Sequence, residues 1–273
     1  MPDVVALTLR ASVSESIEVE ALIPNRVADL SEAEIAALPV WAGSRQAAVG
    51  DFFTVKGERV PRLQIEGDLR HVDGLGAGCA GGELLVHGSV GHRVGEGMTG
   101  GWIDVRGDVG DDAGVAMQGG ALRVTGDAGD RLGAAASGAA TGMTGGEIVV
   151  NGSAGRDAGA RVRRGLIVIG GNAGADAARA IIAGTLVVFG RTGENAGRGS
   201  KRGSIVALGG IDVPATYEFS CTYQPAYIRL LLTYLHRRYG MGVERAVLDG
   251  SYNRYCGDNA ALGRGEILEL VQV

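Results

Sequence analysis

Residues 61–209 repeat themselves with a period of 19, and this repeat limits the possible fold more than any other feature of the chain. Each unit reads Gly-x-apolar-x-apolar-x-Gly, and a weaker unit that starts at Pro61 precedes the others. The first glycines of the units are Gly82, Gly101, Gly120, Gly146, Gly165, Gly184 and Gly203. Their spacings are 19, 19, 26, 19, 19 and 19, so one unit carries a seven-residue insertion, which we place at residues 134–140.

The apolar positions of the unit predict its structure. Two residues after the first glycine stand Leu84, Ile103, Leu122, Ile148, Ile167, Leu186 and Ile205, and a second apolar residue follows two positions later. Alternating apolar residues between glycines indicate a short strand with one buried face, and so many glycines would destabilise helices. A fixed period near 20 is typical of a solenoid. We therefore expect a mainly β protein, a parallel β-helix of seven to eight coils.

A second inward row is predicted three residues before each first glycine. It comprises Cys79, Met98, Met117, Met143, Val162 and Ile181, and it ends at Ser200. Since equivalent residues of stacked coils lie about 4.8 Å apart, each row would form a continuous ladder through the core.

The segments on either side of the repeats differ from them in composition. Residues 1–60 predict an N-terminal α+β cap, with a helix that begins at the capping box of Ser31 and Glu34. Residues 211–273 predict a C-terminal cap, with an amphipathic helix that Pro225 opens and Gly240 ends. The expected organisation is therefore 1–60, 61–210 and 211–273, with the caps covering the open ends of the stack.

Composition excludes several classes of function. The net charge of −5 argues against nucleic acid as a partner. The three cysteines form no CxxC motif, which favours a reducing compartment. No signal peptide or long apolar run is present, so we expect a cytoplasmic protein with no membrane partner.

Motifs for catalysis and metal binding are weak. Gly95–Gly100 fits GxGxxG, but it precedes a strand and is one copy of the repeat. The four histidines never fall at ligand spacing. Aspartates recur beside the glycines, and we interpret them as solvated corners rather than calcium ligands: Asp108, Asp111, Asp112, Asp127 and Asp130. We predict no catalytic residue and no metal site in this chain.

The residue between the two inward positions should point outward, because side chains alternate along a strand. Asp104 and Arg123 take this position in neighbouring coils and predict an opposite-charge pair on a solvated face. Four later coils place valine there and form an apolar row, widened by Phe189: Val149, Val168, Val187 and Val206. Monomers rarely leave such a row bare. It is covered either by the terminal segments of the chain or, as we predict, by a partner subunit.

Basic residues recur at one turn of two coils. Arg163 and Lys201 hold the same position in the repeat, as do Arg164 and Arg202. Two coils correspond to about 10 Å, so the four cations could bind a long anionic ligand or an acidic partner. The alternative is a solvated edge balanced by nearby carboxylates.

The repeats resemble a known domain. Residues 143–155 and 161–169 are similar to the GXGXG β-helix domain that is shared by the glutamate synthase large subunit and the C subunit of formylmethanofuran dehydrogenase. The flanking motifs resemble the second family: Leu38-Pro-Val-Trp-Ala-Gly43, Gly50-Asp-Phe-Phe-Thr-Val55, Tyr255-Cys-Gly-Asp258 and Gly263-Arg-Gly-Glu-Ile267. Lys56 and Lys201 are the only lysines beside many arginines, which favours the bacterial branch, the formyltransferase/hydrolase complex of methylotrophs.

This resemblance implies a scaffold subunit in one-carbon metabolism. The complex would transfer a formyl group from formyl-tetrahydromethanopterin to a methanofuran-type cofactor, such as methylofuran, and hydrolyse it to formate. Its partners would be an amidohydrolase-like subunit that holds the metal, a formyltransferase and a further subunit. The basic residues Arg163, Arg164, Lys201 and Arg202 would lie near the glutamate-rich tail of the cofactor. The alternatives are the C subunit of a molybdenum or tungsten dehydrogenase and a glutamate-synthase-like module.

Overall fold

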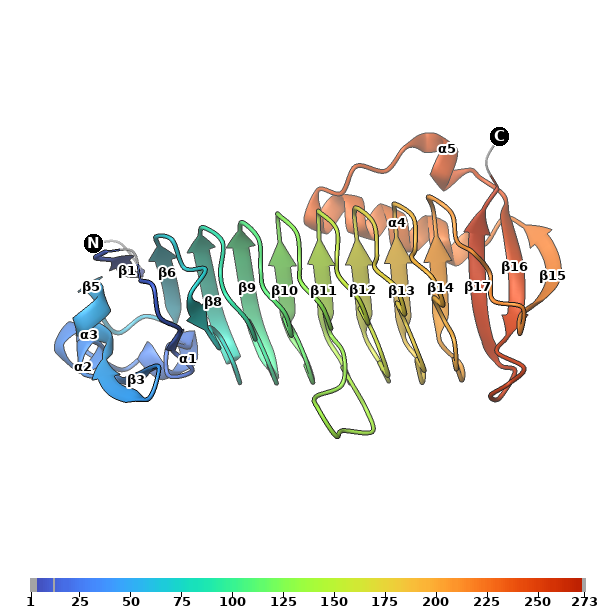
Figure 1. Cartoon of the computed structure of the whole chain (residues 1–273). Helices are drawn as coiled ribbons and strands as arrows, with labels where there is room; N and C mark the ends of the chain where they lie inside the picture. The colour runs from blue at the N-terminus through green and yellow to red at the C-terminus, as the bar shows by residue number, and fades with distance from the viewer. Residues whose placement is uncertain (1–3, 12, 272–273) are drawn as a thin grey trace.

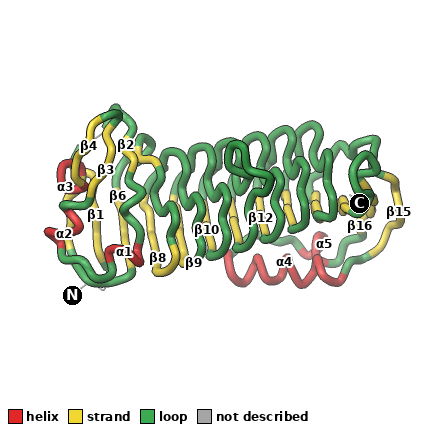
Figure 2. The backbone as a smooth tube through the Cα atoms, turned by 90° about the horizontal axis from the view of Figure 1, so that it is seen from below, coloured by secondary structure: helices red, strands yellow, loops and turns green. Residues whose placement is uncertain are grey.

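The computed structural model describes residues 4–11 and 13–271, and its main feature is one sheet of 13 strands. The protein is mainly β, and most neighbouring strands of this sheet are parallel (Figure 1). The repeats supply β6 (Arg62–Glu66), β8 (Ala80–His87), β9 (Gly100–Arg106), β10 (Ala121–Val124), β11 (Glu147–Val150), β12 (Leu166–Ile169), β13 (Thr185–Val188) and β14 (Ser204–Ala207). They pair in chain order, so each repeat makes one turn of the winding chain, as Figure 2 shows.

The strand register confirms the predicted inward rows. Leu84 pairs with Ile103, Ile103 with Leu122, and the same equivalence continues to Ile205. These residues are at most 1% exposed, and so is the second predicted row from Cys79 to Ile181. The core is therefore a set of aliphatic and methionine ladders, each running the length of the stack.

Close stacking explains the glycines that follow each strand. At Gly107 a Cβ would lie 2.6 Å from the carbonyl carbon of Gly88 in the preceding coil. Gly101, which opens its unit, has φ +83°, a conformation that L-residues with side chains rarely adopt. A second line of single parallel bridges joins the coils on another side, from Leu69 to Thr192.

The extra residues of the long repeat form a protruding loop (Figure 1). In a regular unit the amide of Met117 donates to the carbonyl of Gly114, three residues earlier. In the long unit the amide of Met143 donates to the carbonyl of Gly133, so seven more residues lie between the same two positions. The insertion therefore leaves the register of the sheet unchanged.

The first 60 residues lie at one end of the stack and combine helices with strands. β1 (Val5–Leu9) extends the large sheet beside β6, and β5 (Phe53–Lys56) forms its edge. A small second sheet has the order β4-β3-β2-β7: β4 is Arg45–Ala48, β3 Pro39–Ala42, β2 Ile17–Glu18 and β7 Val72–Asp73. The same segment contains three short helices, which lie between these strands along the chain: α1 (Pro24–Val27), α2 (Glu32–Ala36) and α3 (Val49–Phe52). The predicted capping box of Ser31 and Glu34 starts α2.

The last 60 residues extend the sheet at the other end and also return along its outer face. β17 (Gly265–Leu270) is parallel to β14, and β16 (Tyr252–Gly257) and β15 (Glu218–Tyr223) follow antiparallel. Helix α4 (Ala226–Tyr239) begins after Pro225 and ends at Gly240 in the left-handed conformation, as predicted. It lies across the strands, and the short α5 (Arg245–Leu248) follows it (Figures 1 and 2). Among the described helices, none has the length and apolar content to cross a bilayer.

Candidate functional surfaces

The valine row is covered by the chain itself, which corrects the prediction of a partner interface there. Val149, Val168, Val187 and Val206 are 0% exposed, and Phe189 is partly buried beside them. The residues of α4 that pack against the row are Ile228, Leu232, Leu235 and Tyr239. The alternative in which a terminal segment covers the valines is thus the one that the structure adopts.

Helix α4 is fastened at its C-terminal end by polar and aromatic contacts with β9 and β11. The hydroxyl of Tyr234 donates to the carboxylate of Glu147 at 2.7 Å, and the hydroxyl of Tyr239 donates to the same carboxylate. Burial and then the contact with Glu147 raise the pKa of Tyr239. The ring of Tyr239 stacks on Trp102 at 5.7 Å, and the guanidinium of Arg238 lies 5.1 Å from the centre of the Trp102 ring. This cluster marks where the cover ends.

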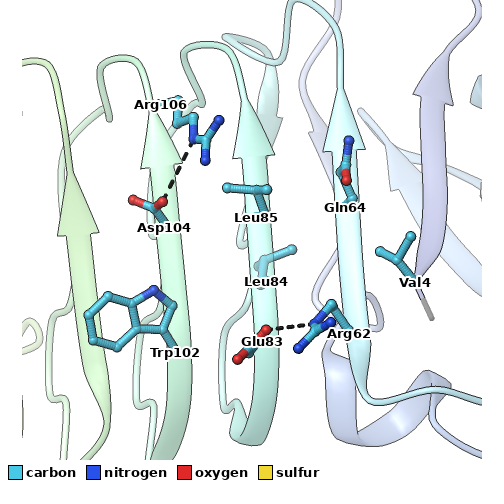
Figure 3. Close-up of a pocket in the computed structure, with 9 residues that line it drawn as sticks. All are labelled: Val4, Arg62, Gln64, Glu83, Leu84, Leu85, Trp102, Asp104 and Arg106. Atoms are coloured by element: carbon cyan, nitrogen blue, oxygen red, sulfur yellow. Dashed lines mark hydrogen bonds and ion pairs between the residues drawn. The ribbon is translucent and has the colours of Figure 1, made fainter. Parts of the chain in front are cut away.

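Beyond this end, the same row of the sheet continues without a described helix over it. The register carries the outward position of Val149 to Arg123, Asp104, Leu85 and Gln64, and we call these last four residues the open row. Figure 3 shows part of it, in a hollow lined by Val4, Arg62, Gln64, Glu83, Leu84, Leu85, Trp102, Asp104 and Arg106. This hollow was not predicted from the sequence, although alternation along β9 puts Trp102 on the same face as Asp104.

The predicted contact between Asp104 and Arg123 does not form. Asp104 instead lies 3.8 Å from Arg106 on its own strand, a long ion pair (Figure 3). The side chain of Asp104 is 14% exposed, so this part of the face is less solvated than expected. Its Oδ1 and the Nε of Arg123 are both buried without a hydrogen-bond partner. Buried polar atoms are normally paired, and leaving one unpaired costs about 1–3 kcal/mol.

The basic residues of the two-coil turn are exposed, as predicted. We call Arg163, Arg164, Lys201 and Arg202 the basic corner. In residues 4–11 and 13–271 none of the four forms an ion pair, whereas Arg156 and Arg179 in nearby turns contact Asp176 and Asp157. The charges of the basic corner therefore face solvent and are not neutralised by carboxylates of the described chain. Arg161, in the same turn, donates to the carbonyl of Ala139 in the protruding loop at 2.8 Å.

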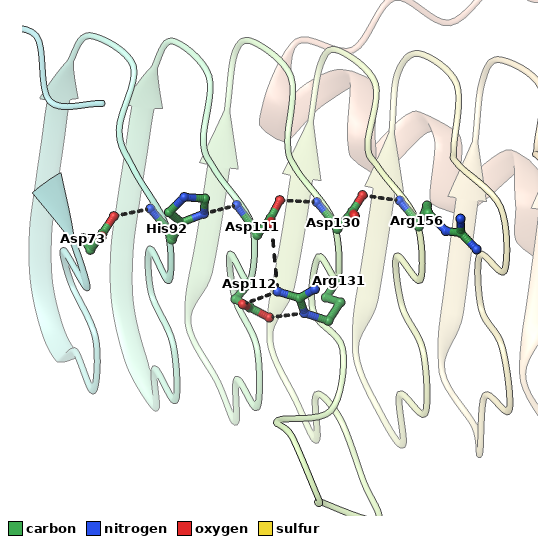
Figure 4. Close-up of polar contacts among 7 residues, drawn as sticks. All are labelled: Asp73, His92, Asp111, Asp112, Asp130, Arg131 and Arg156. Carbon is green, nitrogen blue, oxygen red and sulfur yellow. Dashed lines mark hydrogen bonds and ion pairs between the residues drawn. The ribbon is translucent and has the colours of Figure 1, made fainter. Parts of the chain in front are cut away.

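The recurring aspartates are partly or fully exposed, as expected of solvated corners, and most of them also accept hydrogen bonds from backbone amides of the next coil. Along one line, Asp73 accepts from the amide of His92 at 2.7 Å, Asp111 from Asp130 at 2.8 Å, and Asp130 from Arg156 at 2.8 Å (Figure 4). The Nδ1 atom of His92 accepts from the amide of Asp111 and fills the remaining step.

A second line of the same kind runs through neighbouring positions. Asp108 accepts from the amide of Asp127, and Asp127 accepts from that of Ser153. Asp112 instead binds the guanidinium of Arg131 with two hydrogen bonds, which raise the pKa of Arg131 (Figure 4). Within the described chain, no group of three or more histidine, cysteine, aspartate or glutamate side chains could hold a metal ion.

The fold places this chain among mainly β repeat proteins. Its turns share one mostly parallel sheet, and extra elements lie at both ends. No family model matches the chain. A stretch of 88 residues is 37% identical to the C subunit of the formyltransferase/hydrolase complex Fhc of Methylorubrum extorquens. A stretch of 91 residues is 31% identical to the C subunit of the tungsten-containing formylmethanofuran dehydrogenase 2 of Methanococcus maripaludis. These stretches cover 33% and 34% of the two relatives, or 32% and 33% of this chain.

A solved structure extends the likeness to nearly the whole chain. One chain of the crystal structure of the formyltransferase/hydrolase complex (FhcABCD) from Methylorubrum extorquens, in complex with methylofuran, superposes with a TM-score of 0.89 and 35% identity. The match covers 98% of this chain and all of that chain. The protein therefore belongs to the family of C subunits of formyltransferase/hydrolase complexes and formylmethanofuran dehydrogenases, the family that its sequence motifs resemble.

Proposed function

We propose that this chain is the scaffold subunit of a formyltransferase/hydrolase complex. That complex would transfer a formyl group from formyl-tetrahydromethanopterin to a methanofuran-type cofactor and hydrolyse it to formate. The observation that carries the proposal is the match to one chain of FhcABCD, which covers that chain completely at 35% identity. Amidohydrolase-like, formyltransferase and further subunits would carry out the chemistry, while this chain holds them in place.

In this proposal the stacked turns are a parallel β-helix of seven to eight coils, spanning residues 61–210. Residues 1–60 and 211–273 close its two ends, which would otherwise present unpaired backbone groups. The sheet supports both assignments, since β1 and β5 continue it beyond β6, while β17, β16 and β15 continue it beyond β14. A stiff rod closed at both ends suits a scaffold that positions other subunits.

The basic corner is proposed to lie near the anionic tail of the cofactor. Its four cations are exposed and unpaired within the described chain, and they come from turns about 10 Å apart. This donor set fits a chain of carboxylates, because extended polyanions are bound by spaced cations. Replacing Arg163 and Lys201 by Gln should lower cofactor retention in the purified complex while leaving the subunits assembled. Unchanged retention would remove the basic corner from the proposal.

Purification of the complex under mild conditions from its own host, followed by native mass spectrometry, tests the main proposal. We expect amidohydrolase-like and formyltransferase subunits to accompany the chain, without molybdenum or tungsten. The 31% identity to part of a tungsten-containing dehydrogenase supports a second candidate, the corresponding subunit of such an enzyme. A metal-pterin subunit in the preparation would favour this second candidate, and a chain that purifies alone would contradict both.

A further inference from the structure

The open row continues the surface on which α4 packs, and the described chain leaves it uncovered. It occupies the same register position as the valine row, on neighbouring strands of the same sheet. Where α4 lies, every side chain of this row is fully buried, and past Tyr239 the row changes to partly exposed residues. The outer face is thus one surface, half of which is covered by the chain's own helix.

The covered half shows what shape of ligand this surface accepts. Ile228, Leu232, Leu235 and Tyr239 are the buried residues of α4, at intervals of four, three and four. One such interval advances a helix by about 5.4 Å, close to the strand spacing of about 4.8 Å. A helix laid across these strands therefore places one side chain over each strand. The strands of the open row are interior to the sheet, so their backbone groups are already paired and only a side-chain face is available.

The open row also shows what its ligand must supply. Leu85 and Trp102 form an apolar floor, and the charged side chains of Asp104 and Arg123 continue the row beside it. Asp104 Oδ1 and Arg123 Nε are already enclosed by the chain, so a ligand can reach these two side chains only through their other polar atoms. A donor over Asp104 and an acceptor over Arg123 are the groups that complement these charges. Aromatic and arginine side chains around an apolar centre are also typical of sites where binding energy is concentrated.

We propose that the open row is the binding site for an α-helix from a partner subunit, and that this helix lies end to end with α4. The helix has about three turns, since the row spans three strand spacings, or about 14 Å. Its inward side chains, spaced by three or four residues, are an acceptor over Arg123, a donor over Asp104 and an apolar residue over Leu85. This inference rests on the proposed function, because it requires a complex in which such a partner exists.

Two experiments on the complex from its own host test this inference. Leu85→Arg places a long cation on the apolar floor, and we expect it to lower recovery of one partner subunit at least about tenfold. Leu262→Arg is the matched control, since Leu262 is 59% exposed in the C-terminal tail, and recovery should be unchanged. The thermal midpoint of each purified variant chain shows whether it folds. A folded Leu85→Arg chain that retains all partners would overturn the proposal.

A photo-crosslinking residue in place of Gln64 gives an answer that does not depend on a destabilising substitution. We expect crosslinks to one helical segment of a partner subunit, and this segment should carry the predicted acceptor, donor and apolar residue. Crosslinks to a second copy of this chain, to its own first residues or to a non-helical segment would overturn the inference while leaving the scaffold proposal intact. Absence of any partner from the wild-type preparation would instead overturn the proposed function, and this inference with it.

Discussion

The two halves of the outer face share one strand register and differ most clearly in the central outward residue of each strand. From β11 to β14 the central outward residue is valine, and α4 covers it. From β6 to β10 the equivalent residues are Gln64, Leu85, Asp104 and Arg123, and no helix of the described chain lies over them. The inward rows are apolar in both halves. In this fold the inward positions specify the stack, and the outward positions are free to specify what binds to it.

The largest expected effect comes from placing a charged residue, of the kind found in the open row, at a valine position of the covered half. Val187→Asp would bury a carboxylate beneath α4, and we expect a loss of about 4 kcal/mol or more in the free energy of unfolding. Denaturant titration measures this loss, and proteolysis should then cut near α4 while the repeats stay intact. A loss below about 1 kcal/mol would show that α4 holds the valine row only loosely.

Alkaline pH should weaken the packing of the covered half. Burial raises the pKa of Tyr252, which packs in the same cluster as the valine row, to about 12, and burial with the Glu147 contact also raises the pKa of Tyr239. Both phenols are neutral in the folded state at a pH where the unfolded chain ionises. Their contribution is therefore complete below pH 10 and is lost as the pH rises from 10 towards 12, on the order of 2 kcal/mol for Tyr252.

Near-ultraviolet circular dichroism and unfolding titrations at several alkaline pH values measure this weakening. Tyr252→Phe is the control, because it removes the ionisable group while keeping the ring in its cluster. The variant should show a smaller decline in stability between pH 10 and 12. An equal decline in both proteins would assign the effect to groups elsewhere.

The boundary between the halves depends on one carboxylate. Tyr239→Phe removes the hydroxyl that donates to Glu147 and should cost about 1.5 kcal/mol, since hydrogen bonds to charged groups contribute about 1.5–3 kcal/mol. Stacking of the ring on Trp102 should persist, so the fluorescence spectrum of the protein should change little. A large spectral shift would mean that the hydroxyl, rather than the ring, positions the end of α4.

The smallest effect is expected from the reverse exchange, Asp104→Val, which places a valine at the same outward position on β9, two strands from Val149. It removes a buried oxygen without a partner, so the free energy of unfolding of the isolated chain should rise by up to about 1 kcal/mol. A clear decrease, measured by denaturant titration, would show that Asp104 supports the fold of the chain itself.

Local patterns in the sequence were enough to predict the stack, its inward rows, the start of α2 and the limits of α4. Each depends on side-chain periodicity, on the capping of Ser31 or on the left-handed glycine at 240, all of which are properties of nearby residues. What lies over the outer face could not be predicted in this way. The match between α4 and the valine row joins segments that are far apart in the sequence, and it depends on how the chain turns back after β15.

The roles of the aspartates were also beyond local patterns. Asp111 and Asp130 are separated by a full repeat, so their hydrogen bond exists only once the coils have stacked. Their spacing of 19 residues equals the repeat itself. This equal spacing indicates that each carboxylate can accept a hydrogen bond from the next coil. The unpaired atoms of Asp104 and Arg123 could not be predicted for a similar reason, because these atoms are buried only once the coils have stacked.

Because the register of the repeats is constant, the number of coils sets the distance between the two ends of the stack. Every coil adds one strand spacing of about 4.8 Å to the separation between the two ends, whatever its side chains are. The protruding loop between Gly133 and Met143 shows that extra residues can enter without changing that separation. Only the gain or loss of a whole 19-residue unit would alter it, in fixed steps, and would move everything attached beyond that point by the same step along a straight axis.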